Sequence, residues 1–223
     1  MTISITLVIV IITCAISISG FSNQRVIDDL IFYPPAIQGR NQYYRFISHG
    51  FIHADIGHLA FNMIALYSFG ETLELLYNYN CLFGNKGKLF YILLYFLGLI
   101  AASVPDFFKH RDSYHFRSLG ASGAVSAVIF SSIVLLPTSG IGIIFIPGIN
   151  IPGYIFAIIY LAVSAYLDRK GGGNINHGAH ISGAIFGIVF TLVFVSLFGH
   201  INIMDNFIDQ IRAAKPFLPD CNF

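Results

Sequence analysis

The sequence predicts an all-α membrane protein built as a bundle of six transmembrane helices. Only 10% of its 223 residues are charged and 56% are hydrophobic, whereas a soluble domain carries about 25% charged residues. The mean hydropathy is +0.73. So few ionic groups cannot cover a water-facing surface, and disorder is excluded because it requires low hydrophobicity and high charge. The net charge of +1 gives no basic surface for a nucleic acid.

Six apolar stretches have about the length of a membrane-spanning helix, which needs about 20 residues. They are residues 3–20, 56–76, 89–104, 119–136, 152–167 and 175–198. The first could also be a signal peptide, but it lacks a basic flank and a clear cleavage site. Runs this long and apolar exceed what barrel strands need, so helices are expected. We therefore expect residues 1–223 to form one membrane domain with no soluble domain.

Prolines and charges mark several helix ends. The third expected helix stops before Pro105 and the fourth before Pro137, because proline removes a backbone donor and clashes with the preceding turn. The fifth follows Pro152 and ends before the charged Asp168. The longest loop, residues 21–55, is rich in aromatic residues. Two interpretations of it stay open: it lies partly in the membrane interface, or it packs against the helix ends.

Polar side chains inside a membrane are costly and are therefore candidate functional residues. Ser122 lies near the start of the fourth expected helix, between Gly120 and Gly123. Small neighbours allow a close approach, and a helix start offers free N–H groups to a developing anion. A lone serine in a membrane helix more often bonds a backbone carbonyl, and here the flanking glycines favour a nucleophile.

His180 on the sixth expected helix is the natural partner of Ser122, because a neutral imidazole can take the proton of a hydroxyl. Gly183 and Gly187 follow it with the GxxxG spacing that lets two helices pack closely. If the neighbour is the fourth helix, His180 comes within reach of Ser122. The alternative is a packing seam in which His180 is only an interhelical donor.

His58 and Asn62 are four residues apart on the second expected helix, so they share one helical face. Side-chain donors aimed at a forming oxyanion contribute about 2.7–4 kcal/mol each. A nucleophile, a base and a pair of donors together indicate acyl transfer by a serine, most simply amide hydrolysis.

At these residues the sequence resembles the rhomboid family of intramembrane serine proteases. The family's GxSG motif matches GASG at 120–123, its HxxxN motif matches HLAFN at 58–62, and its AHxxGxxxG pattern matches 179–187. The six-span order and the first loop match over nearly the whole chain. His53 lies where that loop leads into the second span, and the loop's aromatic-Arg pair matches 44–45, with a tyrosine where tryptophan is common.

The resemblance implies a six-helix rhomboid bundle with a Ser122–His180 dyad in a water-filled cavity below the membrane surface. His58, Asn62 and the backbone N–H of Ser122 would form the oxyanion hole. Arg45 and Glu74 would pair with each other and brace the first loop. Substrates would be other transmembrane proteins, cut near a helix end where small or helix-breaking residues unwind the strand. The resemblance implies no metal and no organic cofactor, and it leaves the oligomeric state open.

The resemblance also implies an integral protein of the bacterial inner membrane, with the N-terminus in the cytoplasm and the active site toward the outside. That arrangement runs counter to the positive-inside rule, because it places eight of the twelve Lys and Arg residues outside. A second departure is Ser126. Many relatives carry an aromatic ring one turn after the nucleophile, stacked on the catalytic histidine, so the support of His180 is not predicted here.

Other classes of protein fit the sequence less well. A metalloprotease could use His49 and His53, but HExxH is absent because Gly50 follows His49. An aspartyl protease is disfavoured because no expected span contains an aspartate. A transporter would be expected to show repeat symmetry or broken helices. The remaining alternative is a rhomboid-like pseudoenzyme that binds and routes membrane proteins; such members lack the serine or the histidine, and this chain keeps both.

Overall fold

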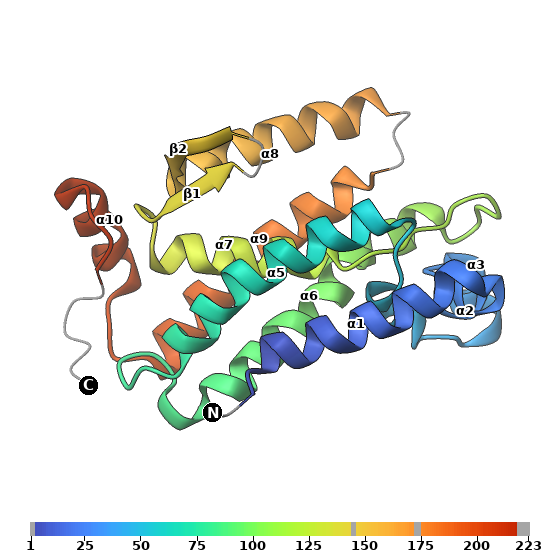
Figure 1. The fold of residues 1–223 in the computed structure, drawn as a ribbon, viewed down its shortest axis with the longest axis horizontal. Coiled ribbons are helices and arrows are strands. Elements are labelled where there is room, and N and C mark those ends of the chain that lie inside the picture. The colour runs from blue at the N-terminus through green and yellow to red at the C-terminus, as the bar shows by residue number, and fades with distance from the viewer. Residues whose placement is uncertain (1–2, 144–145, 172–174, 218–223) are drawn as a thin grey trace.

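The computed structural model describes residues 3–143, 146–171 and 175–217. The long helices are α1 (Ile5–Ser22), α5 (Ile56–Tyr77), α6 (Gly87–His110), α7 (Ser122–Leu135), α8 (Gly153–Lys170) and α9 (His177–Phe198). The shorter elements are α2 (Gln24–Leu30), α3 (Pro34–Arg40), α4 (Arg45–Ser48), η1 (His49–Phe51), η2 (Gly84–Lys86), α10 (Ile203–Ala213) and the strands β1 (Gly140–Ile143) and β2 (Ile146–Pro152). The predicted all-α membrane bundle is confirmed (Figure 1).

A helix lies over each of the six stretches that the sequence singles out. By length and composition, three helical segments of the described chain can cross a membrane: Ile5–Ser22, Gly84–His110 and His177–Phe198. The helix Ser122–Leu135 is apolar but shorter. The count of six membrane crossings therefore stays a prediction.

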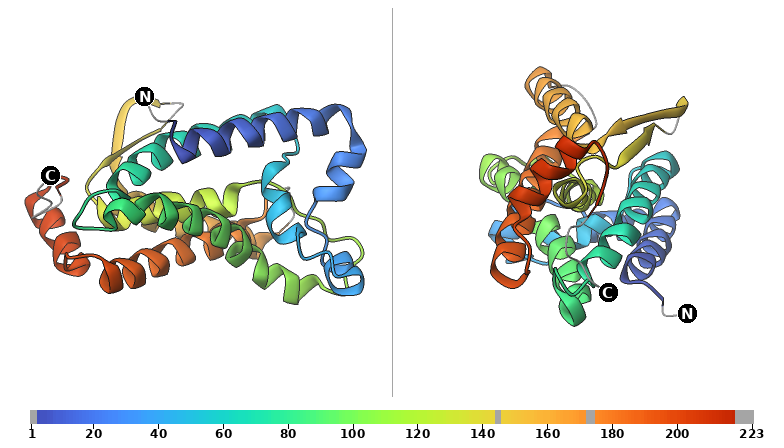
Figure 2. Two further views of the ribbon diagram at one scale, coloured as in Figure 1. Left: turned by 90° about the horizontal axis from the view of Figure 1, so that it is seen from below. Right: turned by 90° about the vertical axis from the view of Figure 1, so that its left-hand side faces the viewer.

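Helix α7 lies at the centre of the bundle, and α5, α6 and α9 pack around it (Figure 2). Every residue of α7 after Ser122 is buried. A helix that is apolar on all sides has no face to turn to lipid or water, so it is expected to be enclosed by its neighbours. The nucleophile candidate thus begins the most enclosed helix of the protein.

The closest helix contact is between α7 and α9. A Cβ atom added at Gly183 would overlap the carbonyl of Gly123, and one added at Gly187 would overlap the backbone of Ala127. The two glycines are one turn apart and so lie on one face of α9. The GxxxG spacing predicts such a close approach, and α7 is the helix that packs against these two glycines.

The predicted end of the third helix is wrong. Helix α6 continues through Pro105 to His110, whereas the sequence suggests a stop before the proline. Proline interrupts only one backbone hydrogen bond, and neighbouring groups in a membrane bundle can satisfy the freed carbonyl. The extension places Asp106 inside a helix, where it is buried, so the statement that no span holds an aspartate is also wrong.

A two-stranded antiparallel sheet between α7 and α8 is a further difference from the prediction. β1 pairs with β2 so that Gly140 faces Pro152 and Ile141 faces Ile151. Figure 1 shows this hairpin and α10 toward one end of the bundle, with α2 and α3 at the other. The segment is apolar and rich in isoleucine, so its local pattern separates it poorly from the adjoining helices.

The two glutamates of α5 bind the start of α1. Glu74 is buried, and its carboxylate accepts hydrogen bonds from the backbone N–H groups of Ile5 and Thr6, each at 2.9 Å. Glu71 accepts a hydrogen bond from the hydroxyl of Ser4. Negative charge at a helix N-terminus satisfies orphan donors and complements the helix dipole. These bonds explain why a membrane helix carries two carboxylates.

The predicted pairing of Arg45 with Glu74 is therefore wrong. Arg45 is buried in the first loop, where its guanidinium donates to the carbonyls of Asp28 at 3.0 Å and Ile31 at 2.7 Å, and to the side chain of Gln42 at 2.7 Å. Arginine braces the loop through backbone carbonyls and needs no carboxylate to do so. Glu74 instead joins α5 to α1.

Candidate active site

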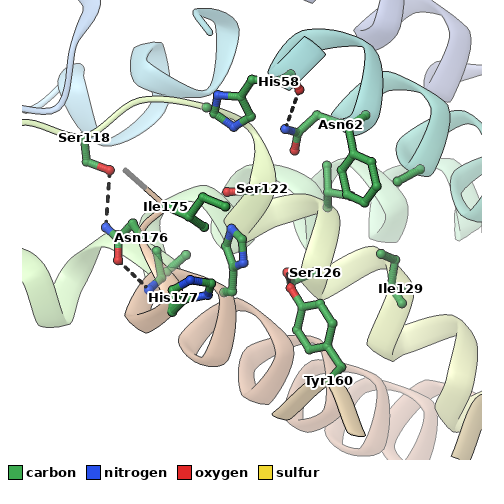
Figure 3. Close-up of a pocket in the computed structure, with 18 of the residues that line it drawn as sticks. His58, Asn62, Ser118, Ser122, Ser126, Ile129, Tyr160, Ile175, Asn176 and His177 are labelled. Carbon is green, nitrogen blue, oxygen red and sulfur yellow. Dashed lines mark hydrogen bonds between the residues drawn. The ribbon is translucent and has the colours of Figure 1, made fainter. Parts of the chain in front are cut away.

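A cavity of about 1260 Å³ is lined by residues from α5, α6, α7, α8 and α9. The four residues that the sequence singles out for catalysis, Ser122, His180, His58 and Asn62, all contribute to its wall. In Figure 3, His58 and Asn62 from α5 lie on one side of Ser122, and His177 from α9 lies on the other. Residues from three helices that are distant in sequence therefore meet at one cavity.

Ser122 is the first residue of α7, and the chain enters that helix through a left-handed residue. Gly120 has φ of +112°, and a Cβ atom there would lie 2.9 Å from Cε1 of His58. Glycine alone accepts both the backbone angle and the close ring. Val125 N–H bonds the carbonyl of Ala121 at 3.0 Å, and the N–H groups of the three residues before it are the orphan donors of the helix start.

The first loop holds the residues that precede Ser122. The N–H of Ala121 donates to Nε2 of His53 at 3.3 Å, and the N–H of Gly120 donates to the carbonyl of His49 at 2.9 Å. Further upstream, Phe32 and Ser118 form an antiparallel β-bridge. The loop therefore fixes the path of the backbone into Ser122.

The hydrogen bonds of His53 define its protonation. Nε2 accepts from Ala121, so the ring proton is on Nδ1, which lies 2.9 Å from Oγ of Ser17. Ser17 in turn donates to the carbonyl of Phe51 at 2.9 Å. In this series of hydrogen bonds, every donor has an acceptor only when His53 is neutral. Burial lowers the pKa of His53 to about 3 and that of His49 to about 4.

These two histidines predict an acid-sensitive fold. Their pKa values lie below the ordinary value of about 6.5, so between pH 6.5 and about 4 the unfolded chain binds more protons than the folded one. The contribution of these two histidines to the free energy of unfolding is then constant above about pH 7 and falls below pH 6.5, by up to about 1.4 kcal/mol per pH unit for each histidine. Thermal unfolding in detergent at pH 7.5, 6 and 5 measures this slope.

Replacing His53 with glutamine, which cannot take the proton, should reduce the slope. Replacing the exposed His115 with glutamine should leave it unchanged and serves as the control. A melting temperature that does not change between pH 7.5 and pH 5 would contradict the neutral, buried state of both rings.

The start of α9 is fixed by Asn176. Its side-chain carbonyl accepts from the N–H of Ala179 at 3.0 Å, which caps the helix. Its amide nitrogen donates to the carboxylate of Asp106 and, at 3.3 Å, to the hydroxyl of Ser118. One side chain thus joins the start of α9, the end of α6 and the segment before α7. Figure 3 shows the bonds of Asn176 to Ser118 and to the start of α9. An asparagine just before an apolar helix is a capping signal that the sequence contains.

His180 follows Ala179 in the first turn of α9. A Cβ atom on Gly123 would lie 3.6 Å from the carbonyl of Ala179, so the first turns of α7 and α9 are neighbours. Within the described residues no hydrogen bond joins Ser122 to His180. Catalytic hydrogen bonds are often long or poorly aligned before substrate binds, so the arrangement is compatible with a dyad.

Asn62 is buried in α5, and its amide nitrogen donates to the carbonyl of His58 at 2.9 Å. An amide nitrogen carries two hydrogens, so this bond orients the group and leaves a second donor. Asn62 and His58 are thus connected within one helical turn, as their spacing predicts.

The histidines that a metal site would use have other partners. His49 contacts the hydroxyl of Ser103 at 3.0 Å, and His53 is engaged by Ser17 and Ala121. In the described part of the chain, no group of three or more His, Cys, Asp or Glu side chains is arranged to hold a metal ion. Asp106, which the extended α6 brings to the cavity, binds Asn176.

Residues 40–197 match the Rhomboid domain family. Because this match covers well over half of the chain, the protein belongs to the rhomboid family. The resemblance in the sequence motifs and the family match thus agree.

The curated relatives include both a named protease and rhomboid-like proteins. RHOMBOID-like protein 12, mitochondrial, of Arabidopsis thaliana is 31% identical over 153 residues, which cover 62% of this chain and 42% of the relative. Rhomboid protease GluP of Bacillus subtilis (strain 168) is 29% identical over 156 residues, 66% of this chain and 25% of the relative. The human presenilin-associated rhomboid-like protein, mitochondrial, is 29% identical over 140 residues, 62% and 34% of the two chains. The chain matches less than half the length of each.

Proposed function

We propose that the protein is an intramembrane serine endopeptidase that hydrolyses peptide bonds in or near the transmembrane segments of other membrane proteins. The observation that supports this most directly is the meeting of Ser122, His180, His58 and Asn62 at one cavity. The sequence of one relative, named a protease, supports the same class. The alternative is a rhomboid-like protein that binds and routes membrane proteins without cutting them.

The proposed reaction begins with attack of Ser122 Oγ on the carbonyl carbon of the scissile bond, while His180 takes the hydroxyl proton. The resulting oxyanion accepts hydrogen bonds from the N–H of Ser122 and from the side chains of Asn62 and His58. His180 then gives its proton to the leaving amine as the C–N bond breaks. A water molecule, deprotonated by His180, attacks the acyl-enzyme, and the proton returns to Ser122 as the second product leaves.

Two assays on the purified wild-type protein test the proposal. The first follows cleavage of a model transmembrane protein that carries small or helix-breaking residues near one helix end. The second follows covalent labelling of Ser122 by a fluorophosphonate, which reports an activated serine without any substrate. Cleavage together with labelling supports the protease. A folded protein that retains a transmembrane protein but neither cleaves nor labels would support the binding alternative and overturn the proposal.

Asn62→Ala separates an oxyanion donor from a structural residue. A donor that acts only in the transition state gives a kcat lower by about 10²–10³-fold with little change in KM. The melting temperature of the variant in detergent shows whether the bond to the carbonyl of His58 also stabilises α5. Unchanged kcat, or loss of the folded protein, would contradict the proposed role.

The proposed location is the inner membrane of a bacterial cell, with the cavity opening toward the outside. One relative is bacterial, whereas the names of two others contain the word mitochondrial. An epitope inserted after the exposed Asp112 tests the orientation, because it lies in the segment between α6 and α7 at the same end as Ser122. Binding of an antibody in intact spheroplasts supports the outward arrangement, and binding only after permeabilisation reverses it.

A further inference from the structure

An aromatic ring from α8 lies beside His180. The rings of Tyr160 and His180 are nearly parallel, with an interplanar angle of 21° and centroids 6.3 Å apart. Aromatic rings attract one another at centroid separations of about 4.5–7 Å. Both residues line the cavity, so the tyrosine ring is in a position to restrict rotation of the imidazole.

The hydroxyl of Tyr160 is anchored on the helix of the nucleophile. It lies 2.7 Å from Oγ of Ser126, and Ser126 is 2% exposed on α7, one turn after Ser122. Figure 3 shows the two side chains pointing toward each other across the cavity wall. The small side chain of Ser126 leaves the space that the tyrosine hydroxyl occupies.

Two further rings fix the plane of Tyr160. Phe130 on α7 lies with its centroid 5.4 Å from that of Tyr160, and Phe156 on α8 lies 5.7 Å away. Of the α8 side chains, Ser164 is buried and Tyr160 is partly buried against the core. Tyr160 thus connects α8 to α7 through its hydrogen bond with Ser126 and to α9 through its ring contact with His180.

We propose that Tyr160, anchored by Ser126, is a positioning residue that holds the imidazole of His180 in the orientation that faces Ser122. The proposal rests on the proposed protease function. Ring contact limits the side-chain angles of His180, and the hydroxyl bond limits those of Tyr160. Helix α8 thus supplies the aromatic ring, and α7 supplies Ser126, which binds the hydroxyl of that ring.

Tyr160→Leu removes the ring and tests the proposal. A small misplacement of a catalytic group costs up to about 10²-fold in rate, so we expect kcat to fall about tenfold to hundredfold while KM changes less than about twofold. The rate of fluorophosphonate labelling should fall in the same proportion, because it depends on activation of Ser122 and on no bound substrate. Tyr166→Leu, on the same helix but 65% exposed, is the matched control and should leave both rates unchanged.

Tyr160→Phe and Ser126→Ala each break the hydrogen bond between these two residues and keep the aromatic ring beside His180. They therefore test the role of the hydrogen bond separately from that of the ring. Each should lower kcat by a similar factor, smaller than that of Tyr160→Leu, and the double variant should be no slower than either single variant. This double-mutant cycle also tests the positioning role of Tyr160 if Tyr160→Leu fails to fold. Additive effects of the two changes would overturn the anchoring role.

The outcomes distinguish the two proposals. A wild-type protein that neither cleaves nor labels refutes the protease function. An active wild type whose Tyr160→Leu variant keeps full kcat and full labelling rate refutes the positioning role alone. A higher KM with unchanged kcat would mean that Tyr160 contacts the substrate and does not act through His180, which also refutes it.

Discussion

Ser122→Ala and His180→Ala are each expected to lower the rate of cleavage of a transmembrane substrate by at least about 10⁴-fold, because nucleophile and base act as one unit. Without the hydroxyl no acyl-enzyme forms, and without the imidazole the hydroxyl keeps its proton. For the same reason the double variant should be no slower than either single variant. The rate is measured with purified protein at saturating substrate.

The matched control is Ser132→Ala. Ser132 lies on the same helix and lines the same cavity, and its buried hydroxyl has no hydrogen-bond partner among the residues that the structure describes. Its removal should leave the rate within about twofold, since it contributes no donor to the reaction. Each variant should keep a wild-type melting temperature. Appreciable cleavage by either the Ser122 or the His180 variant would eliminate the dyad.

The helices that carry the candidate site follow from local pattern. Apolar runs of about 20 residues determine where a chain can cross lipid, and the polar exceptions Ser122, His58 and His180 are conspicuous within them. The sequence could therefore predict the helix order and the candidate residues. The local pattern does not predict the end of α6 beyond Pro105. The cost of an interior proline depends on which neighbour satisfies the freed carbonyl, and the local sequence does not identify that neighbour.

Long-range partners could not be read from the sequence. Glu74 binds Thr6, 68 residues earlier, and nothing near either residue identifies the other. The resemblance to a family suggested Arg45 as the partner, but that side chain reaches the carbonyls of its own loop. A buried carboxylate predicts only that donors are close; helix packing decides which donors they are.

The ring beside His180 shows the same limit within the candidate site. The sequence showed that Ser126 cannot provide a ring, but Tyr160 is one of several aromatic residues on an apolar helix. Its contact with His180 depends on the tilt and rotation of α8. Packing against neighbouring helices sets both of these quantities, and the pattern of one segment does not contain them.

The second large effect is expected at Gly187. In a helix interior, alanine is usually more stabilising than glycine by about 0.5–1 kcal/mol. At Gly187 the added Cβ would overlap the backbone of Ala127, and backbone atoms cannot move aside as a flexible side chain can. The change in stability at Gly187 is therefore expected to have the opposite sign. We expect Gly187→Ala to destabilise the protein and Gly187→Val to do so by about 3 kcal/mol or more, measured as the melting temperature in detergent.

Separation of the helices would also break a buried hydrogen-bonded cluster. Thr191 donates to the carbonyl of Gly187 at 2.8 Å and lies 2.6 Å from the hydroxyl of Ser131 on α7, which in turn lies 2.7 Å from the hydroxyl of Tyr77. Buried polar groups left without partners cost about 1–3 kcal/mol each. Ser196→Val adds a β-branched side chain at an exposed position of the same helix and should change stability by no more than about 0.5 kcal/mol.

Activity should fall together with stability, because the contact between α7 and α9 also sets the distance between Ser122 and His180, the two residues of the proposed dyad. Ser122 and His180 lie in the first turns of these two helices; Ser122 directly precedes Gly123, and His180 lies three residues before Gly183. If the helices move apart at Gly187, His180 withdraws from Ser122, and kcat falls even at temperatures where the variant is fully folded. A Gly187→Val protein with wild-type kcat would show that the contact only stabilises the fold. A Gly187→Val protein with a wild-type melting temperature as well would contradict the predicted overlap between the added side chain and the backbone of Ala127.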